Sequence, residues 1–331
     1  MISPFSAPRE ATAFAPIQQP DSAPSDRTKI KAALTIVPWS ILIAATLFSL
    51  LFPQVAPRLA LPALGVSALL FGMPHGACDV AAWRGARRWN ARIGLFYGLA
   101  ALATFGLWRL SAPLGLCAFL ALTLWHWGEG DAWFAFSRPR ARVWAALGRG
   151  AILMAAPLAF QSRASLEVLQ PLWSLGKEAQ SAPLFLSSLA PIVVGAGGLA
   201  TLWALHLESR NSALWMIETL LILAFWACVP PLLGVALYLS GVHAARHLMR
   251  LETRGGREKT TRSWLQIAAR WHREGAFASL LALLILPVAL KFWPHLAASA
   301  GGWGAAYLVL IAALTTPHAL TVAWLARHQQ L

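Results

Sequence analysis

The sequence predicts an all-α, polytopic transmembrane helix bundle. Of the 331 residues, 58% are hydrophobic and only 12% are charged, whereas soluble domains carry about 25% charged residues. Apolar segments of bilayer length recur along the chain. Basic residues gather between alternate segments, as they do in proteins that cross a membrane several times. This composition excludes a soluble domain, a disordered chain and a disulfide-rich scaffold.

Ten apolar segments each have the roughly 20 residues that a helix needs to cross a bilayer. They lie at 30–52, 58–80, 91–111, 113–136, 143–160, 182–207, 212–228, 231–250, 274–294 and 303–328. Residues 1–26 are rich in Pro, Ser and Ala, and we predict a disordered N-terminal arm there. Residues 27–331 are predicted to form a single transmembrane helical domain.

The basic residues predict the orientation of the bundle. The chain carries 27 Lys and Arg residues and a formal net charge of +14. With the N-terminus inside, only five of them fall in the outer loops: Arg58, Arg109, Arg163, Lys177 and Lys291. This bias predicts about ten spans in the inner cell membrane, with both termini cytoplasmic. The positive charge is therefore interpreted as a mark of topology, and no nucleic-acid partner is expected.

Two connections between the predicted spans are long. The outer connection covers 161–181, and the inner loop covers 251–273. The inner loop is basic, and Trp264, Ile267 and Trp271 recur there at helical spacing. This stretch is either an amphipathic helix in the headgroup layer or a solvated basic loop.

Five histidines fall inside predicted spans, where ionisable groups are costly and usually functional. They are His75, His126, His243, His247 and His318. Each lies on a segment that runs from outside to inside, roughly 18 to 26 Å from its outer end at 1.5 Å per residue. Four helices therefore place imidazole rings at one level, in the inner half of the bilayer.

A four-histidine metal site is predicted from their spacing. His243 and His247 form an HxxxH pair, which places both rings on one helix face and suits one metal ion. His75 and His126 lie at the same depth and complete the set. Ligation by imidazole without Cys suits Zn, Cu, Fe or Ni. Spacing alone does not choose between an iron oxygenase and a zinc hydrolase.

Acidic residues follow two of these histidines. Asp79 lies four residues after His75, so its carboxylate is expected to accept the ring N–H and orient that ligand. Glu129 and Asp131 follow His126 and are candidates for the same role. For all three acids the alternative is a place at the inner membrane surface, where the spans end.

Five sequence elements around the histidines resemble the Brp/Blh family of bacterial and archaeal membrane proteins, the β-carotene 15,15′-dioxygenases. They occur in the family's order: GMPHGACDV (72–80), WHWGEGD (125–131), RGAILMAAPLAF (149–160), PPLLGVALYLSGVHAARH (230–247) and TTPHALTVAWLARH (315–328). The sequence departs from the family pattern at Trp127, where Phe is usual, at 239–242, and at Gln161, where His is usual.

The resemblance implies an Fe(II)-dependent dioxygenase that cleaves the central double bond of β-carotene with O2, giving two retinal molecules. It implies His75, His126, His243 and His247 as iron ligands, with His318 nearby as a reserve ligand or a group behind the ligands. A retinal-binding rhodopsin would be a downstream partner, and membrane lipid would surround the enzyme.

Aromatic residues near the histidines are candidates for the walls of an apolar substrate channel. The resemblance implies this role for Tyr238, and proximity to the histidines suggests it for Phe71, Trp125 and Trp127. An apolar polyene offers no polar handle, so channel length and shape would set specificity.

Other functions stay open at this point. A zinc-dependent intramembrane lipid hydrolase would also use histidines from several helices. A membrane di-iron desaturase would need more histidine clusters than the single HxxxH. A non-enzymatic haem-binding or transport protein is the third alternative.

Overall fold

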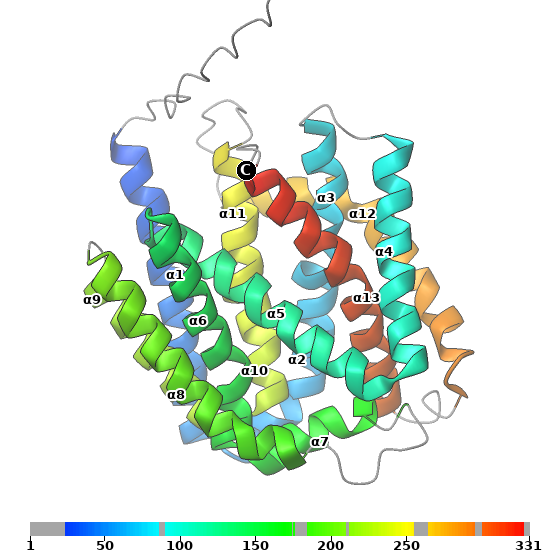
Figure 1. Ribbon diagram of the computed structural model, residues 1–331, viewed down its shortest axis with the longest axis horizontal. Helices are drawn as coiled ribbons and strands as arrows, with labels where there is room; N and C mark the ends of the chain where they lie inside the picture. Colours follow the sequence, from blue (N-terminus) through cyan, green and yellow to red (C-terminus); the bar gives the residue numbers. More distant parts are fainter. Residues whose placement is uncertain are drawn as a thin grey trace, which may run out of the picture.

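The computed structural model describes residues 24–85, 90–173, 175, 184–209, 212–254, 264–294 and 300–327. These residues form helices and no strand, and the long helices run up and down as one bundle (Figure 1). The first turns of α1 and the last turns of α13 lie at the same end of the bundle, the upper end in this view. The helices are α1 (Pro24–Leu51), η1 (Ala56–Leu59), α2 (Ala60–Ser67), η2 (Ala68–Gly72), α3 (Met73–Gly85), α4 (Ala91–Leu110), α5 (Ala112–Ala135), α6 (Pro139–Phe160), α7 (Ser162–Trp173), α8 (Leu184–Leu207), α9 (Ser212–Cys228), α10 (Pro231–Tyr238), η3 (Leu239–Ala244), α11 (Ala245–Arg254), α12 (Trp264–Leu290) and α13 (Ala300–Arg327).

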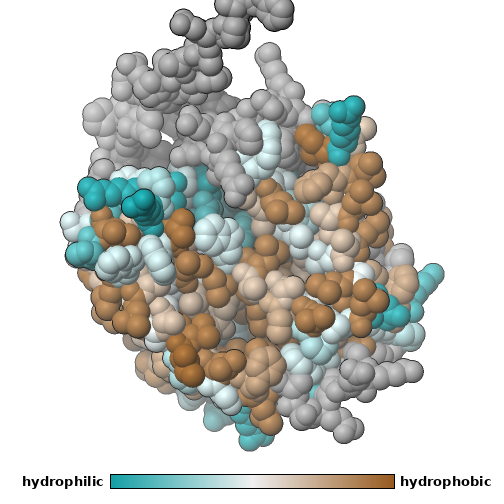
Figure 2. Space-filling model, viewed as in Figure 1, coloured by the Kyte–Doolittle hydropathy of each residue, from teal (hydrophilic) through white to brown (hydrophobic). Residues whose placement is uncertain are grey.

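Six helices of the described residues are long and apolar enough to cross a membrane. They are Leu34–Leu51, Ala56–Asp79, Ala91–Leu110, Pro139–Phe160, Leu184–Leu207 and Gly302–Trp324, and Ser212–Cys228 is a shorter apolar helix. Large apolar side chains on these helices are exposed, for example Leu102 and Leu199. Figure 2 shows apolar residues spread over the visible face, with hydrophilic residues toward its margins. The chain is therefore a membrane protein with an all-helical fold.

Within the described residues, every predicted span overlaps a helix or a run of consecutive helices. The helix α5 and the run from α10 to α11 are among the segments that are not both long and apolar enough to be assigned as membrane-crossing helices. Both carry buried histidines and charged residues, which lower their hydropathy. Six apolar helices do not by themselves establish ten spans, so that count stays a prediction.

Both long connections contain helix, which the sequence pattern left open for the inner loop and did not predict for the outer one. The outer connection at 161–181 includes α7, and the amphipathic end of the inner loop forms the first turns of α12, which begins at Trp264. Residues 255–263 of that loop lie outside the described residues. The predicted arm 1–26 also lies outside them, apart from its last three residues, which begin α1.

Glycine residues bring α5, α6 and α8 into close contact. A Cβ atom on Gly128 would lie 1.9 Å from the carbonyl oxygen of Ala146, and one on Gly150 would lie 1.9 Å from that of Leu124. The α5 and α6 backbones therefore touch, as small residues permit in membrane bundles. Because Gly128 follows His126 by two residues, this crossing fixes the depth of that histidine.

Two π-helical turns interrupt the helices that carry other histidines. The turn η2 ends just before α3 and His75, whereas η3 contains His243. The two turns pack together, and a Cβ on Gly72 would lie 3.2 Å from the Leu239 side chain. Such turns change the direction of the following side chains and are frequent at functional sites. Here they turn two histidine-bearing helices toward each other.

Candidate metal centre

Five imidazole rings from four parts of the chain meet inside the bundle. His75 comes from α3, His126 from α5, His243 and His247 from the η3–α11 run, and His318 from α13. Neighbouring rings have centroids 4.8 to 6.5 Å apart. His75 is partly exposed and the other four are buried. The five histidines that were expected at one level thus lie next to one another in the structure.

The nitrogen atoms of three histidines are close enough for a metal site. His75, His126 and His243 each offer a nitrogen within 4.8 Å of the other two. The Nε2 atoms of His126 and His243 are 3.2 Å apart. Two nitrogens that each bind one ion at about 2.0–2.1 Å lie about 2.8–3.4 Å apart when the angle between the two bonds is between 90° and the tetrahedral value. The distance fits two ligands of one ion, and it also fits a hydrogen bond between two neutral rings.

Ring nitrogens without a protein partner also fit a metal. The Nδ1 atom of His75 lies 3.1 Å from the carbonyl oxygen of Phe71, to which it can donate. The Nε2 atoms of His247 and His318 are buried and have no hydrogen-bond partner among the described residues. Leaving a buried polar nitrogen unpaired is costly, and such groups call for an explanation. A bound metal ion would provide one.

Asp79 bonds a different histidine from the one expected. Both of its carboxylate oxygens lie 2.9 to 3.0 Å from Nδ1 of His318. The hydroxyl of Tyr97 donates to the same carboxylate at 3.1 Å. The prediction that Asp79 orients His75 is therefore wrong. Spacing along α3 placed Asp79 and His75 on one face, but α13 brings His318 closer to the carboxylate.

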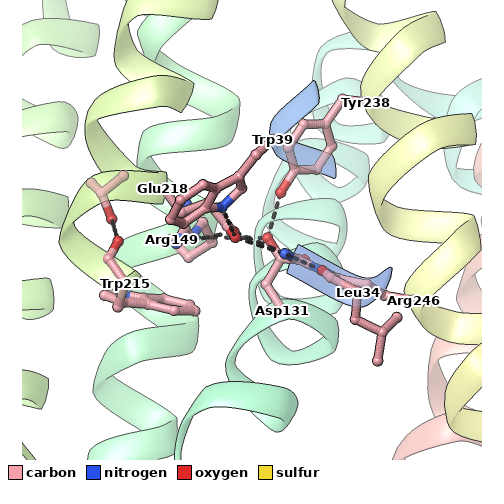
Figure 3. A network of polar contacts seen from close by, with 9 residues as sticks. Leu34, Trp39, Asp131, Arg149, Trp215, Glu218, Tyr238 and Arg246 are labelled. Atoms are coloured by element: carbon pink, nitrogen blue, oxygen red, sulfur yellow. Dashed lines mark hydrogen bonds and ion pairs between the residues drawn. The ribbon is translucent and has the colours of Figure 1, made fainter. Parts of the chain in front are cut away.

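Figure 3 shows a buried network of ion pairs that includes Asp131 and Arg246, which lie close in sequence to His126 and His243. Arg246 pairs with Asp131 at 2.8 Å and with Glu218 at 2.7 Å. Arg149 lies 3.4 Å from Glu218 and 3.9 Å from Asp131, and its guanidinium stacks 3.9 Å from the ring centroid of Trp215. Two acids and two arginines balance in charge, which makes their burial tolerable.

Several sequence interpretations change with this network. Arg246 is not among the five outer-loop charges and so contributes to the predicted inner-side bias, but its side chain is only 7% exposed. Glu218, for which the sequence offers no basic partner, has two, and it also accepts a hydrogen bond from the Trp39 indole at 3.0 Å. Arg149 could have been found by the rule that identified the histidines, because it too is ionisable and lies inside an apolar segment.

Glu129 and Asp131 are also placed away from the imidazole nitrogens. Glu129 forms a two-pronged ion pair with Arg250, with distances of 2.8 and 3.1 Å. Asp131 bonds Arg246 and accepts a hydrogen bond from the hydroxyl of Tyr238. Both acids thus hold α5 against the helix run that carries His243 and His247, and neither bonds one of the five clustered histidines.

The four candidate channel residues fall into two pairs. Trp127 stacks on His243 with centroids 5.3 Å apart and on Tyr238 at 5.4 Å. Tyr238 is fully buried. Trp125 is 37% exposed, and Phe71 is half-buried with its ring 6.4 Å from that of His272. The first pair packs behind the cluster, whereas the second lies nearer the outside.

A family model described as β-carotene 15,15′-dioxygenase matches residues 66–326. The chain belongs to this family. It is also 29% identical, over 94% of its own length and 96% of the other protein, to the probable β-carotene 15,15′-dioxygenase Blh of Halobacterium salinarum. No solved structure matches the chain. As a member of the β-carotene 15,15′-dioxygenase family, the chain is an enzyme that cleaves a carotenoid oxidatively in the membrane.

Proposed function

We propose that this β-carotene dioxygenase cleaves the central double bond of β-carotene with O2, giving two retinal molecules, at a ferrous ion held by His75, His126, His243 and His247. The observation that carries the proposal is the convergence of these rings within the matched part of the chain. Iron suits an all-imidazole donor set. Bound ferrous iron would supply the activation of dioxygen, which the protein side chains cannot provide.

The residues of the chain position the metal and keep water away. The four imidazoles come from α3, α5 and the η3–α11 run, which the glycine contacts and the Arg246 ion pairs hold in register. Trp127 covers one face of His243. Because Phe71 is half-buried beside His75, whereas His126, His243, His247 and His318 are buried, we place the approach of the apolar substrate near Phe71. The shape of the site would position the polyene, because the polyene carries no polar group that the protein could bind.

The membrane arrangement belongs to the same proposal. The chain would cross the inner cell membrane about ten times as a single domain from residue 27, with a cytoplasmic arm at 1–26 and both termini cytoplasmic. The small share of Lys and Arg residues in the predicted outer loops supports this orientation. Lipid would surround the exposed apolar helices and supply the carotenoid, and a retinal-binding rhodopsin is the kind of partner that would take the product.

Expression in a bacterial host that accumulates β-carotene tests the function. The expected result is loss of colour with retinal in the pigment extract. Shorter or longer apocarotenals would contradict central cleavage, and unchanged β-carotene would contradict the activity. His126→Ala should restore the colour, whereas His206→Ala should not, because His206 stacks on Trp203 away from the cluster.

Metal analysis of the purified protein separates the remaining alternatives. Stoichiometric iron in the wild type, lost in His126→Ala, supports the proposal. Stoichiometric zinc with lipid hydrolysis would favour the hydrolase instead. A haem absorption band would favour a haem protein.

A further inference from the structure

We infer that His318 is a fifth imidazole ligand of the metal, and that Asp79 and Tyr97 hold its ring in the ligating orientation. The inference rests on the proposed metal site and concerns residues outside its four-histidine set. Three helices contribute to the arrangement, because His318 lies on α13, Asp79 on α3 and Tyr97 on α4.

The first step concerns the Nδ1 side of the His318 ring. Both oxygens of Asp79 lie within 3.0 Å of Nδ1, and a carboxylate accepts hydrogen bonds. The proton of a neutral His318 therefore resides on Nδ1, which leaves Nε2 with a free lone pair. Metal-binding histidines commonly donate their other ring N–H to a carboxylate, which fixes the tautomer and strengthens the ligand.

The second step concerns the Nε2 side. This atom is buried and has no hydrogen-bond partner in the part of the chain that the structure describes. The ring centroid lies 4.8 Å from that of His126 and 5.0 Å from those of His75 and His247. Leaving a buried ring nitrogen without a partner is costly. A metal ion shared with the neighbouring rings removes this cost.

The third step is that the anchor of His318 is itself held in place. Tyr97 donates to Asp79 at 3.1 Å. Nearby, the hydroxyl groups of Thr104 and Thr316 are 2.9 Å apart and join α4 to α13 two residues before His318. Within the described residues, His318 alone of the five clustered histidines bonds a carboxylate. It is thus the member of the cluster whose orientation is best fixed for ligation.

X-ray absorption spectroscopy of the iron-loaded full chain tests the inference without relying on activity. In His318→Gly the number of nitrogen ligands should fall by one, and added imidazole should restore it. His206→Gly is the matched control, with an unchanged spectrum. An identical ligand number in wild type and His318→Gly would overturn the inference and leave the four-histidine site standing. A wild-type protein that binds no iron would instead contradict the proposed function.

Asp79→Asn provides a second variant in case His318→Gly does not fold. It keeps the ring of His318 but weakens its anchor, so iron affinity should fall by roughly 10–100-fold. Tyr97→Phe should lower the affinity less, because Asp79 keeps its bond to His318. An unchanged affinity in Asp79→Asn would count against a ligating His318.

Discussion

The guanidinium of Arg246 lies 2.8 Å from the carboxylate of Asp131, and each residue closely follows a clustered histidine on its own helix. Arg246 comes three residues after His243, and Asp131 comes five residues after His126. The same guanidinium reaches Glu218 on α9. One side chain therefore joins three helices directly behind the metal centre.

Replacing Arg246 with Met should destabilise the protein strongly. Asp131 would keep only the more distant Arg149 and the Tyr238 hydroxyl, and Glu218 would lose its shortest ion pair. Removing one partner of a buried ion pair costs about 3–5 kcal/mol. Thermal unfolding in detergent, together with iron content, measures the effect.

Arg163→Met is the control for that variant. Arg163 pairs with Glu167 on the surface of α7, and its side chain is 94% exposed, so its loss should leave the unfolding temperature unchanged. If both variants unfold at the wild-type temperature, the buried network does not stabilise the bundle.

Gly150→Ala should separate α5 from α6 and lower iron content. The added Cβ would meet the Leu124 carbonyl at 1.9 Å, and a backbone atom cannot rotate away. Overpacking of this kind costs about 1–3 kcal/mol, and Leu124 is two residues from His126. Gly98→Ala, where a Cβ meets nothing within 4 Å, should bind iron like the wild type. Equal iron content in both variants would show that the crossing does not position the histidine.

Tyr238→Phe distinguishes a structural role from a substrate-lining one. The ring would still stack on Trp127, but the hydrogen bond to Asp131 would be lost. Hydrogen bonds to charged groups contribute about 1.5–3 kcal/mol, so the unfolding temperature should fall. The cleavage products should stay the same, because Tyr238 is fully buried. A changed cleavage position at wild-type stability would return Tyr238 to the channel wall.

The hydrophobic pattern predicted the helices well because the position and length of each helix follow from a continuous apolar segment of the sequence. The histidines were also found, since an ionisable residue inside an apolar segment is conspicuous. Partners between helices were not predictable in the same way. Spacing along α3 suggested that Asp79 serves His75, but the choice of His318 depends on how α13 packs. The buried ion pairs of Arg246 were not predictable either, because Arg246 lies near the end of the predicted span 231–250, where basic residues usually face water.

Glu208 gives the protein a pH-dependent contact outside the spans. Its carboxylate follows α8 and accepts hydrogen bonds from the backbone N–H groups of Ser137 and Arg138, at 2.7 to 3.0 Å, just before α6 begins. Arg138 in return donates to the last carbonyl of α8, that of Leu207, at 2.7 Å. Burial raises the pKa of Glu208, but the hydrogen bonds from Ser137 and Arg138 outweigh it, so the pKa lies below its ordinary value.

The stabilisation by Glu208 should therefore be present at neutral pH and disappear in acid. A carboxyl group whose pKa is lowered on folding stabilises the protein above its unfolded pKa, near 4.3, and loses this effect as the pH falls through the folded value. Glu208→Gln should lower stability at pH 7 by about 0.5–1.5 kcal/mol, the usual net contribution of a hydrogen bond. The difference from wild type should shrink as the pH is lowered below about 4. Thermal unfolding of both proteins from pH 7 to pH 3 measures this, with the exposed Glu167→Gln as control. A difference that stays constant over the whole range would mean that the charge of Glu208 does not contribute.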